Sequence, residues 1–390
     1  MSGKTLLPGT TAGGQQTTLG VMGGGQLGRM FVQAAQAMGY FTAVLDPDPA
    51  SPAGLVSHYH VQADYLDEQG LAQMMQRCGA ITTEFENVPA GAMLTLGAHR
   101  PVAPGADALR IAQDRIKEKA HFAACGVPCA PYAALTDASQ LAGVPDTLLP
   151  GILKTARLGY DGKGQIRVAD HAALAAAWAE LKGVPCVLEQ LLPLQAECSL
   201  IVARGWDGTL VHFPVQRNVH RDGILATTEV FDGNLPDGIA AQALDAARAI
   251  AEGLQYVGVL CVEFFVLQGA DRLLVNEIAP RPHNSGHYTI DACEQSQFDL
   301  QERTLAGLPL VPPRQHSPAI MLNLLGDLWQ AGTPDWAAML ALPGVHLHLY
   351  GKLAARPGRK MGHITITGVS VAQVRATAAQ AAALLGLQAG

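Results

Sequence analysis

The chain has 390 residues, of which 49% are hydrophobic and 15% are charged, a composition typical of a compact globular protein of two or three domains. Its formal net charge of -7 excludes a general attraction to nucleic acid, and the sequence holds no basic stripe interleaved with aromatic residues. No apolar run approaches the roughly 20 residues that a membrane span needs, so no membrane partner is expected.

The first 16 residues are rich in Gly, Thr and Gln and lack the apolar core of a signal peptide, so we expect a disordered lead-in there. The seven cysteines are scattered along the chain without paired metal-ligand spacing. Their scatter favours a reducing, cytoplasmic setting.

Residues 17–112 begin with a strand, a glycine turn, a helix and a second strand, which predicts a βαβ domain on a parallel sheet. The turn GGGQLG (23–28), with Asp46 after the second strand, has the spacing of a dinucleotide fingerprint. Glycines and a helix N-terminus suit any phosphate, including a sugar monophosphate, and a purely structural turn stays open as an alternative. Further along, Glu84, Glu86 and Asn87 follow a strand end, where α/β sheets commonly bind ligands.

A second domain is predicted over residues 113–310, after a helix over 111–126. A strand there ends in Lys154 and leads into a glycine-rich loop, which can close over a triphosphate while the lysine acts as a point charge. An ordinary hairpin with a surface lysine is the alternative. Glu189 then ends an apolar run, and the linker after it can read an adenine edge while Glu197 accepts ribose hydroxyls.

The most informative pattern is CVEFF (261–265) followed by LLVNEIAPRPHNSGH (273–287). A hairpin folded about Ala270 places Glu263 opposite Glu277, and both carboxylates then leave the same face of the sheet. Opposed like charges are destabilising on their own, and Mg²⁺ is the natural ion between them. The alternative is an exposed strand pair whose acids are paired with Lys or Arg.

Residues 316–390 follow the linker PLVPPRQHSP and form a smaller C-terminal unit that contains HLHLYGK, the basic turn ARPGRK and HITITG. Lys352, Arg356, Arg359 and Lys360 concentrate positive charge in this acidic protein. A solvated charged loop is the ordinary explanation.

The order of these elements resembles the ATP-grasp superfamily, and within it the 5-(carboxyamino)imidazole ribonucleotide synthases. The resemblance spans about residues 18 to 370 and rests on GGGQLGRM, QDR (113–115), GYDGKGQ (159–165), HRDGIL (220–225), NEIAPRPHNSGH and RPGRKMGH (356–363). It implies α/β and α+β architecture: an ATP-grasp fold, an N-terminal Rossmann-like preATP-grasp domain that binds the ribonucleotide, and a small C-terminal domain that contributes a substrate-phosphate loop.

The resemblance also implies residue roles. Nucleotide contacts are expected from Arg115, Lys154, Gly159, Tyr160, Asp161, Gly162, Lys163, Gly164, Gln165, Glu189, Gln190, Leu191, Leu192, Glu197, His220, Asn276 and Glu277. Glu263 and Glu277 would bind Mg²⁺, or Mn²⁺ in its place, and Arg281, His283 and Asn284 would lie near bicarbonate. The ribonucleotide would meet Gly25, Gln26, Leu27, Glu86, Tyr160, Lys352 and Arg359. Asp161 is the candidate for proton removal from the attacking amine.

The implied activity is ATP-dependent carboxylation of aminoimidazole ribonucleotide by bicarbonate through carboxyphosphate, in purine biosynthesis. Loop 159–165 would be the lid that excludes water. Three alternatives stay open: an ATP-grasp ligase that uses formate or an amino acid, a nicotinamide-dependent dehydrogenase based on GGGQLG and Asp46, and a non-catalytic ATP-binding scaffold. The family is typically dimeric, so the resemblance implies a homodimer.

Overall fold

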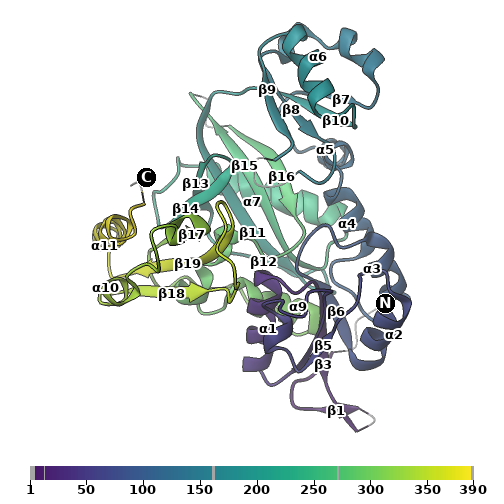
Figure 1. The fold of residues 1–390 in the computed structure, drawn as a ribbon, viewed down its shortest axis with the longest axis vertical. Coiled ribbons are helices and arrows are strands. Elements are labelled where there is room, and N and C mark those ends of the chain that lie inside the picture. The colour runs from purple at the N-terminus through teal and green to yellow at the C-terminus, as the bar shows by residue number, and fades with distance from the viewer. Residues whose placement is uncertain (1–4, 13, 160–162, 270–271, 388–390) are drawn as a thin grey trace.

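The computed structural model describes residues 5–12, 14–159, 163–269 and 272–387. Figure 1 shows three bodies: the N-terminal domain, a small lobe around α6, and a large sheet that runs from the middle of the molecule to the C-terminal helices. Within the described ranges, no helix combines the length and the apolar character that crossing a membrane requires.

The N-terminal domain is built on a parallel sheet with the strand order β5-β4-β3-β6. Its strands are β3 (Thr18–Met22), β4 (Phe41–Leu45), β5 (Tyr59–Val61) and β6 (Ala80–Thr83). Its helices are α1 (Gln26–Ala37), α2 (Glu68–Arg77), α3 (Ala90–Gly97) and α4 (Ala106–Ala112). The predicted strand, glycine turn, helix and parallel strand are confirmed, because β3 and β4 pair in parallel on either side of α1.

A small antiparallel sheet with the order β7-β10-β8-β9 forms the lobe at the top of Figure 1. Its strands are β7 (Tyr132–Leu135), β8 (Gly151–Thr155), β9 (Gln165–Val168) and β10 (Cys186–Gln190). Helix α6 (His171–Glu180) packs on it through Leu174 and Trp178. Helix α5 (Arg115–Ala124) lies where this lobe meets the large sheet.

The large sheet is antiparallel, with the order β16-β15-β11-β13-β14-β17-β19-β18 and β12 paired to β11. Its strands are β11 (Leu194–Arg204), β12 (Leu210–His212), β13 (Gln216–Arg221), β14 (Ile224–Val230), β15 (Gly258–Leu267), β16 (Leu273–Ala279), β17 (Ala319–Leu325), β18 (Val345–Leu349) and β19 (Lys360–Thr367). The C-terminal strands therefore continue this sheet through the β14–β17 pairing instead of forming a sheet of their own.

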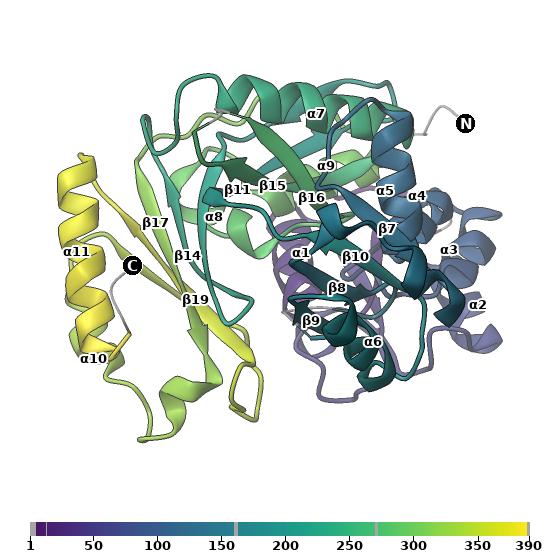
Figure 2. The same ribbon diagram turned by 90° about the horizontal axis from the view of Figure 1, so that it is seen from above.

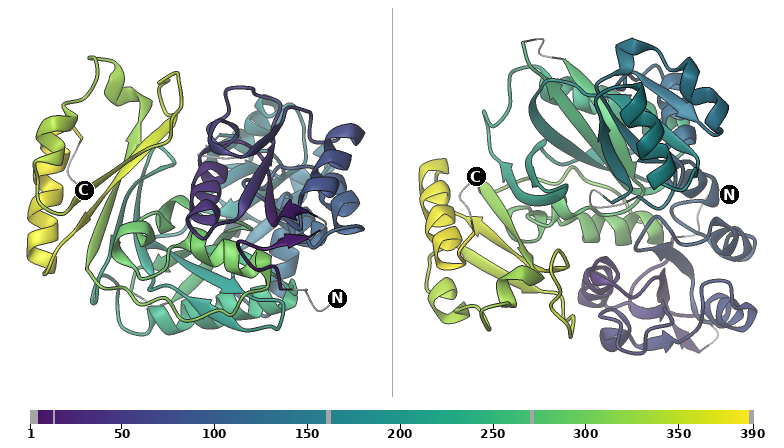
Figure 3. Two further views of the ribbon diagram at one scale, coloured as in Figure 1. Left: turned by 90° about the horizontal axis from the view of Figure 1, so that it is seen from below. Right: turned by 45° about the horizontal axis from the view of Figure 1, so that its top comes forward.

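Different helices cover the two faces of this sheet. Helix α7 (Ile239–Gly253) buries Ile239, Ala243, Ala247 and Ile250, at spacings of three and four residues, against Leu260 and Val262 of β15. The opposite face carries Cys261, which packs with Leu300 of α9 (Gln297–Ala306). Side chains alternate along a strand, so Glu263 leaves β15 on the same face as Cys261. Glu263 therefore lies on the face of the sheet that packs against α9, and α7 covers the other face. Figures 2 and 3 show these two helices and the sheet.

Short helices complete the fold. They are η1 (Gly54–Val56), η2 (Ala138–Gly143), η3 (Asp146–Leu148), η4 (Asn284–Gly286), α8 (Thr289–Ala292), η5 (Gly326–Trp329) and α10 (Trp336–Leu340). The long helix α11 (Val371–Leu384) packs Val374 and Ala381 against Leu322 and Ile364 at the C-terminal end of the large sheet.

Two local expectations differ from the structure. In the lead-in, β1 (Thr11–Ala12) pairs with β2 (Gln15–Gln16), and the Leu6 carbonyl accepts from the Tyr40 hydroxyl at 2.6 Å, so the part of residues 1–16 that is described is ordered by contacts distant in sequence. The helix predicted over 111–126 is divided into α4 and α5. The cause is Asp114, whose carboxylate accepts from the Ile116 amide at 3.1 Å and starts a new helix.

Candidate active site

The acid pair lies where the hairpin register predicts. Glu263 of β15 and Glu277 of β16 are direct partners across the antiparallel pair, so both side chains leave one face of the sheet. The register shifts just beyond Glu263, where Phe264 pairs with Val275 and Asn276 is passed over. The predicted turn residue Ala270 lies outside the described residues, but the pairing on both sides of it is unambiguous.

Each acid of the pair has a basic partner. Arg115, the first residue of α5, donates from Nη1 to Glu277 Oε2 at 2.7 Å, and His283 Nε2 lies 3.2 Å from Glu263 Oε1. Burial would raise the pKa of Glu263, but the charge and hydrogen bond of His283 outweigh it and lower that pKa to about 2. The alternative of acids paired with bases is thus partly realised, yet Glu263 is only 13% exposed. A buried, ionised carboxylate of this kind is suited to hold a cation.

Further polar residues share this face of the sheet. Ser199 of β11 pairs with Glu263, and Glu197, two residues earlier, lies on the same side. On the next strand, Asn218 pairs with Glu197 and His220 follows two residues later. The Glu197 carboxylate meets His220 Nδ1 at 2.9 Å, and this partner raises the pKa of His220 even though burial alone would lower it. Two of the residues predicted to meet the nucleotide from this sheet, Glu197 and His220, are therefore in contact.

A chain of hydrogen bonds orients His283. Its Nδ1 meets the Ser285 hydroxyl at 2.9 Å, and that hydroxyl meets Ser199 Oγ at 2.8 Å. Ser199 in turn accepts from the Asn218 amide at 2.9 Å. The Ser285 backbone amide also lies 3.3 Å from Nδ1, so Nε2 is the nitrogen that donates to Glu263. The imidazole is thereby fixed between a carboxylate and a serine pair.

Lys154 of β8 is buried and does not behave as a surface lysine. Its Nζ donates to Glu189 Oε2 at 2.8 Å, while Lys119 of α5 approaches Glu189 Oε1 at 2.9 Å. The two ammonium groups outweigh the effect of burial and lower the pKa of Glu189 to about 2. Three charged groups therefore gather at the junction of the small lobe and α5, and the net charge of this buried cluster is positive.

The glycine loop and the linker after β10 lie at the edge of the same lobe. Thr155 donates to the Gly164 carbonyl at 2.9 Å, Gly164 has a φ of 72°, and Gln165 pairs with Lys154 at the start of β9. Gly159 and Lys163 are at the described ends of the loop, while Tyr160, Asp161 and Gly162 lie outside the described residues. In the linker, the amides of Gln190 and Leu191 donate to Pro131 and Pro150. Leu192 follows directly in the chain.

The segment after β16 also carries Arg281 and Asn284, two more of the predicted residues. Arg281 Nε donates to Glu86 Oε2 at 2.5 Å, which joins the large sheet to the N-terminal domain and holds the pKa of Glu86 below its ordinary value despite burial. Asn284 begins η4 and is 5% exposed. Neither polar atom of its side-chain amide has a hydrogen-bond partner among the described residues. A buried amide of this kind is available to a small polar ligand.

The glycine turn between β3 and α1 differs from the predicted open phosphate site. The amides of Gly25 and Gly28 donate to the two oxygens of Glu84, at 2.6 and 2.8 Å. A Cβ added to Gly25 would collide with the Glu84 carboxylate, which explains why glycine is needed there. Asp46 accepts from the Gly24 amide and from the Tyr65 hydroxyl, so the acid of the dinucleotide fingerprint is used to hold the turn. The turn does bind a carboxyl group, but that group belongs to the protein itself.

Predicted substrate residues from the N-terminal domain and from the C-terminal strands are in contact. Lys352, in the loop between β18 and β19, donates to the Gln26 side chain at the start of α1 and to the Lys360 carbonyl at 2.7 Å. Leu27 follows Gln26 in α1. Arg359 is half-buried and donates to the Ala354 carbonyl at 2.8 Å within the same loop. The basic loop therefore closes on the N-terminal domain, 326 residues away in sequence.

The sequence prediction omitted several residues that hold this site together. Lys119, Glu118, Ser199, Asn218 and Ser285 carry no assigned role there, yet each contacts or supports a predicted residue. Glu118, for example, accepts from the Ile278 amide at 2.7 Å and so fixes α5 to β16 beside Glu277. Burial raises the pKa of Glu118 to about 8. Only the spacing of Glu118 and Lys119 after Arg115, on one helix face, offered a signal in advance.

Comparison with known protein families agrees with this architecture. Residues 16–113 match the ribonucleotide synthetase preATP-grasp domain, residues 120–298 the ATP-grasp domain, and residues 319–377 the phosphoribosylaminoimidazole carboxylase C-terminal domain. The sheets and the site described above, together with these matches, define an ATP-grasp ligase.

Individual relatives narrow the class. The N5-carboxyaminoimidazole ribonucleotide synthase of Brucella melitensis is 44% identical over 90% of this chain and 96% of that protein, and that of Pseudomonas aeruginosa is 40% identical over 94% and 99%. The solved N5-carboxyaminoimidazole synthetase of Staphylococcus aureus complexed with ADP has a TM-score of 0.89 at 36% identity, covering 98% of each chain. The Aspergillus clavatus synthase in complex with ADP and 5-aminoimidazole ribonucleotide has a TM-score of 0.86 at 31% identity, covering 95% of this chain and 98% of that one. This chain belongs to the N5-carboxyaminoimidazole ribonucleotide synthase family.

Proposed function

We propose that the protein carboxylates 5-aminoimidazole ribonucleotide with bicarbonate at the expense of ATP, giving N5-carboxyaminoimidazole ribonucleotide, ADP and phosphate in purine biosynthesis. The observation that carries the proposal is the Glu263–Glu277 pair on the same sheet face as Glu197 and His220, with Arg281, His283 and Asn284 beside it. The names of the similar proteins, including the complex with ADP and the aminoimidazole ribonucleotide, support the choice of substrates.

The nucleotide would lie between the small lobe and the large sheet. Lys154 and Arg115 would neutralise phosphate oxygens, Glu197 and His220 would meet the ribose, and the linker from Glu189 to Leu192 would meet the adenine. Because the Gln190 and Leu191 amides are already bonded, the carbonyl groups of the linker are the better candidates to read the adenine amine. Residues of loop 159–165 would close over the phosphates and exclude water.

Glu263, Glu277 and the Asn276 side chain present oxygen donors, the ligand type that Mg²⁺ and Mn²⁺ prefer. Asn276 Oδ1 is buried and has no hydrogen-bond partner among the described residues, which fits a cation nearby. When bound, the ion would neutralise charge on the transferred phosphoryl group. Arg115 and His283 would then hold the two carboxylates in their places from the other side.

In the first step, a bicarbonate oxygen would attack the γ-phosphorus of ATP, ADP would leave, and carboxyphosphate would form. Arg281 and the unpartnered Asn284 amide would orient bicarbonate and stabilise its charge. In the second step, the substrate amine would attack the carboxyl carbon and phosphate would leave. Asp161 would take the amine proton, and Glu86 would orient the amine.

Lys352, Gln26 and Arg359 would hold the 5′-phosphate of the ribonucleotide where the C-terminal loop meets α1. Since the Gly25 amide donates to Glu84, the phosphate would be held by these side chains and not by the turn amides. A homodimer in the cytoplasm is proposed from the family resemblance alone.

The direct test is ADP release with and without bicarbonate and 5-aminoimidazole ribonucleotide, for wild type and Asp161→Asn. We expect ADP release to require bicarbonate and to be coupled to the imidazole nucleotide, and formate or amino acids to be inactive in place of bicarbonate. Formate-dependent ADP release would instead identify a different ATP-grasp ligase. An Asp161→Asn variant with wild-type rates would remove Asp161 from the mechanism.

A further inference from the structure

A second group of metal-ligating side chains lies outside the proposed active site, on the C-terminal strands. His346 and His348 of β18 are two residues apart and so leave the strand on one face. His363 of β19 is the direct cross-strand partner of His348, which places it on that same face. Asp291 of α8 faces them. Four side chains from three elements therefore converge, and none of them takes part in the chemistry proposed above.

The ligand atoms in this group lie close enough together for one metal ion to bind several of them. Asp291 Oδ2 lies 2.9 Å from His348 Nε2, and Asp291 Oδ1 lies 3.7 Å from His346 Nδ1. One ligand atom from each of Asp291, His348 and His363 lies within 4.8 Å of the other two. Zinc binds nitrogen and oxygen ligands at about 2.0 to 2.2 Å, so a tetrahedral site needs its ligand atoms about 3.3 Å apart. Side-chain adjustments of about 1 Å or more would bring all three onto one ion.

His363 supplies independent evidence for a ligand. The residue is fully buried, and its Nε2 has no hydrogen-bond partner among the described residues. Its Nδ1 lies 2.9 Å from the Tyr350 hydroxyl. If Nδ1 donates to that hydroxyl oxygen, Nε2 keeps a free lone pair, and an outer partner of this kind is what prepares a metal-binding histidine. The ring is stacked on that of His348, so it would have to turn to share an ion with it.

An ordinary hydrogen-bonded pair of His and Asp is the alternative, and this chain contains one for comparison. His171 Nε2 lies 2.8 Å from Asp146 Oδ1, but the side chains are 44% and 95% exposed. Among the described residues, no third Cys, His, Asp or Glu side chain joins this pair to make a possible metal site. In the cluster of Asp291, His348 and His363, the acid is 11% exposed, and the Nε2 atom of His363 is buried without a hydrogen-bond partner among the described residues. The buried, unsatisfied histidine is what distinguishes the two.

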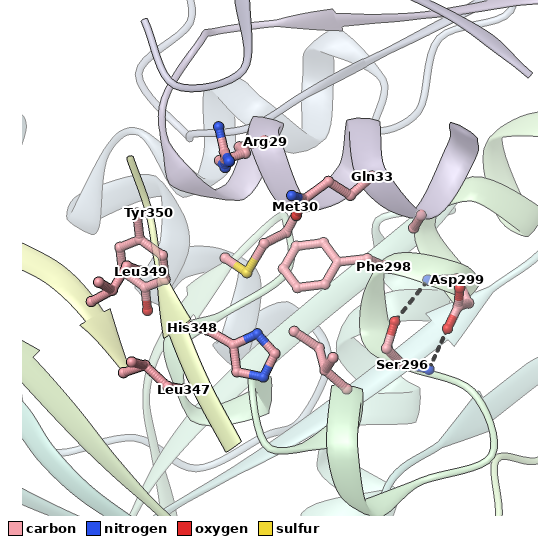
Figure 4. Close-up of a pocket in the computed structure, with 12 residues that line it drawn as sticks. Arg29, Met30, Gln33, Ser296, Phe298, Asp299, Leu347, His348, Leu349 and Tyr350 are labelled. Atoms are coloured by element: carbon pink, nitrogen blue, oxygen red, sulfur yellow. Dashed lines mark hydrogen bonds between the residues drawn. The ribbon is translucent and has the colours of Figure 1, made fainter. Parts of the chain in front are cut away.

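A cavity of about 430 Å³ lies beside the cluster and is lined by one of its members, His348. Its wall is formed by α1, by the start of α9 and by β18, and includes His348 and Tyr350. Figure 4 shows the His348 ring in this wall, below Met30 and Phe298, with Tyr350 at the side. An ion could therefore reach His348 without unfolding of the strands.

We propose that Asp291, His348 and His363 form a binding site for a divalent transition-metal ion of the Zn²⁺ or Co²⁺ type. Two imidazoles and one carboxylate suit these ions better than Mg²⁺, which prefers oxygen ligands throughout. His346 lies close enough to Asp291 to become a fourth ligand or to orient the carboxylate. Tyr350 is a positioning residue for His363.

The location gives the ion a structural consequence. β18 and β19 flank the loop that carries Lys352 and Arg359, while Asp291 belongs to α8, eight residues after His283. An ion bound to His348 of β18, His363 of β19 and Asp291 of α8 would fix the base of the substrate-phosphate loop relative to the segment that follows the proposed bicarbonate site. The site is thus separate from the acid pair and would act by fixing one element relative to another.

The test is a Co²⁺ titration of chelator-stripped, full-length protein, followed by visible absorption, with Zn²⁺ as competitor. The acid pair also binds divalent ions, so the titration is made in a Glu263→Gln/Glu277→Gln background. We expect one Co²⁺ equivalent with the intense absorption of four-coordinate cobalt, displaced by Zn²⁺ and not by Mg²⁺. His363→Gln should weaken that equivalent by about 100-fold or more, and Tyr350→Phe by about 10-fold, the lower end of the effect of outer partners.

His171→Gln, which removes the comparison pair, should leave Co²⁺ binding unchanged. Asp291→Asn is a second ligand variant of nearly the same shape, for the case in which His363→Gln does not fold, and folding of each variant is checked by circular dichroism. Zn²⁺ should also raise the Tm of the background protein and not that of Asp291→Asn. The proposal is overturned if the background protein binds no Co²⁺ equivalent, or if binding survives both ligand variants. Because the acid pair is absent throughout, neither outcome bears on the carboxylation activity.

Discussion

The acid pair of β15 and β16 and the glycine turn between β3 and α1 both collect charge, but they differ in what occupies them. At the acid pair, two carboxylates point to one face and each is held from the side by a base, Arg115 or His283. At the glycine turn, two backbone amides point at one carboxylate, Glu84, which fills the place of an external anion.

The pKa values of the two acids reflect this difference. His283 lowers the pKa of Glu263 to about 2, whereas burial raises that of Glu84 although two amides donate to it. Glu263 is therefore an ionised group that can bind a cation, whereas Glu84 stabilises the glycine turn by accepting hydrogen bonds from its amides. A ligand-binding motif in the sequence thus predicts which kind of group binds at a position. The folded structure shows whether that group is an external ligand or a side chain of the protein itself.

The largest expected effect is at the acid pair. Glu277→Gln should lower ADP release by about 100- to 1000-fold, or about 2.7 to 4 kcal/mol, because it removes charge that is used in the transition state. Steady-state assays at saturating bicarbonate measure this effect. Glu229→Gln is the matched control, since Glu229 is also an acid of the large sheet paired with an arginine, Arg217, at 3.3 Å. Equal losses in the two variants would mean that Glu277 has only a structural role.

The next effect concerns the glycine turn. Below pH 4.5, Glu84→Gln should lower the free energy of unfolding by about 1 to 3 kcal/mol, because the single side-chain oxygen of Gln leaves one of the two amides without its acceptor. Denaturant unfolding measures it, with the exposed Glu180→Gln as control. If Glu84→Gln leaves stability unchanged but abolishes ribonucleotide binding, the turn is a ligand site and the contrast drawn here is wrong.

A smaller effect is expected where the C-terminal loop meets α1. Lys352→Met should raise the KM for 5-aminoimidazole ribonucleotide by about 10-fold, since one charge-assisted contact to phosphate is worth about 1.4 kcal/mol. The KM for ATP should not change. Lys117→Met, which alters an exposed lysine of α5, is the control and should change neither KM. A change in the KM for ATP alone would place Lys352 at the nucleotide.

The smallest effect is a pair of opposite pH dependences in stability. Glu263 has a lowered pKa, so its contribution is present above 4.5, its ordinary value, and is lost as the pH falls toward about 2. Glu84 has a raised pKa, so its contribution is full below 4.5 and is lost as the pH rises through the folded-state value. The advantage of wild type over Glu263→Gln should shrink in acid, and that over Glu84→Gln should shrink toward neutral pH. Unfolding curves between about pH 3 and 7 measure both, and parallel slopes would contradict the assignment.

Local pattern predicted the acid pair because hairpin register depends on residues only a few positions apart. The same holds for the βαβ start and for the placement of Lys154 at a strand end. The partners of these residues were not predictable in this way. Lys119 meets Glu189 across 70 residues, Ser285 meets Ser199 across 86, and Lys352 meets Gln26 across 326. Such contacts depend on how domains pack, which periodicity and turn chemistry do not encode.

Two smaller differences have the same origin. Asp114 divides the expected helix because its side chain caps a new one, a local choice that the apolar pattern hides. The lead-in is ordered because Leu6 finds Tyr40 and Ala306, which are remote in sequence. The roles of Tyr160 and Asp161 stay predictions, since both lie outside the described residues.

The central claim is that Glu263 and Glu277 together hold a divalent ion at the phosphates of the nucleotide. Mn²⁺ binding in the presence of ADP, followed by electron paramagnetic resonance, tests it most directly in wild type and in Glu263→Gln/Glu277→Gln. We predict that wild type binds Mn²⁺ tightly only when ADP is present, and that the double variant weakens this binding by about 100-fold or more. ADP-dependent Mn²⁺ binding of equal affinity in the double variant would contradict the claim.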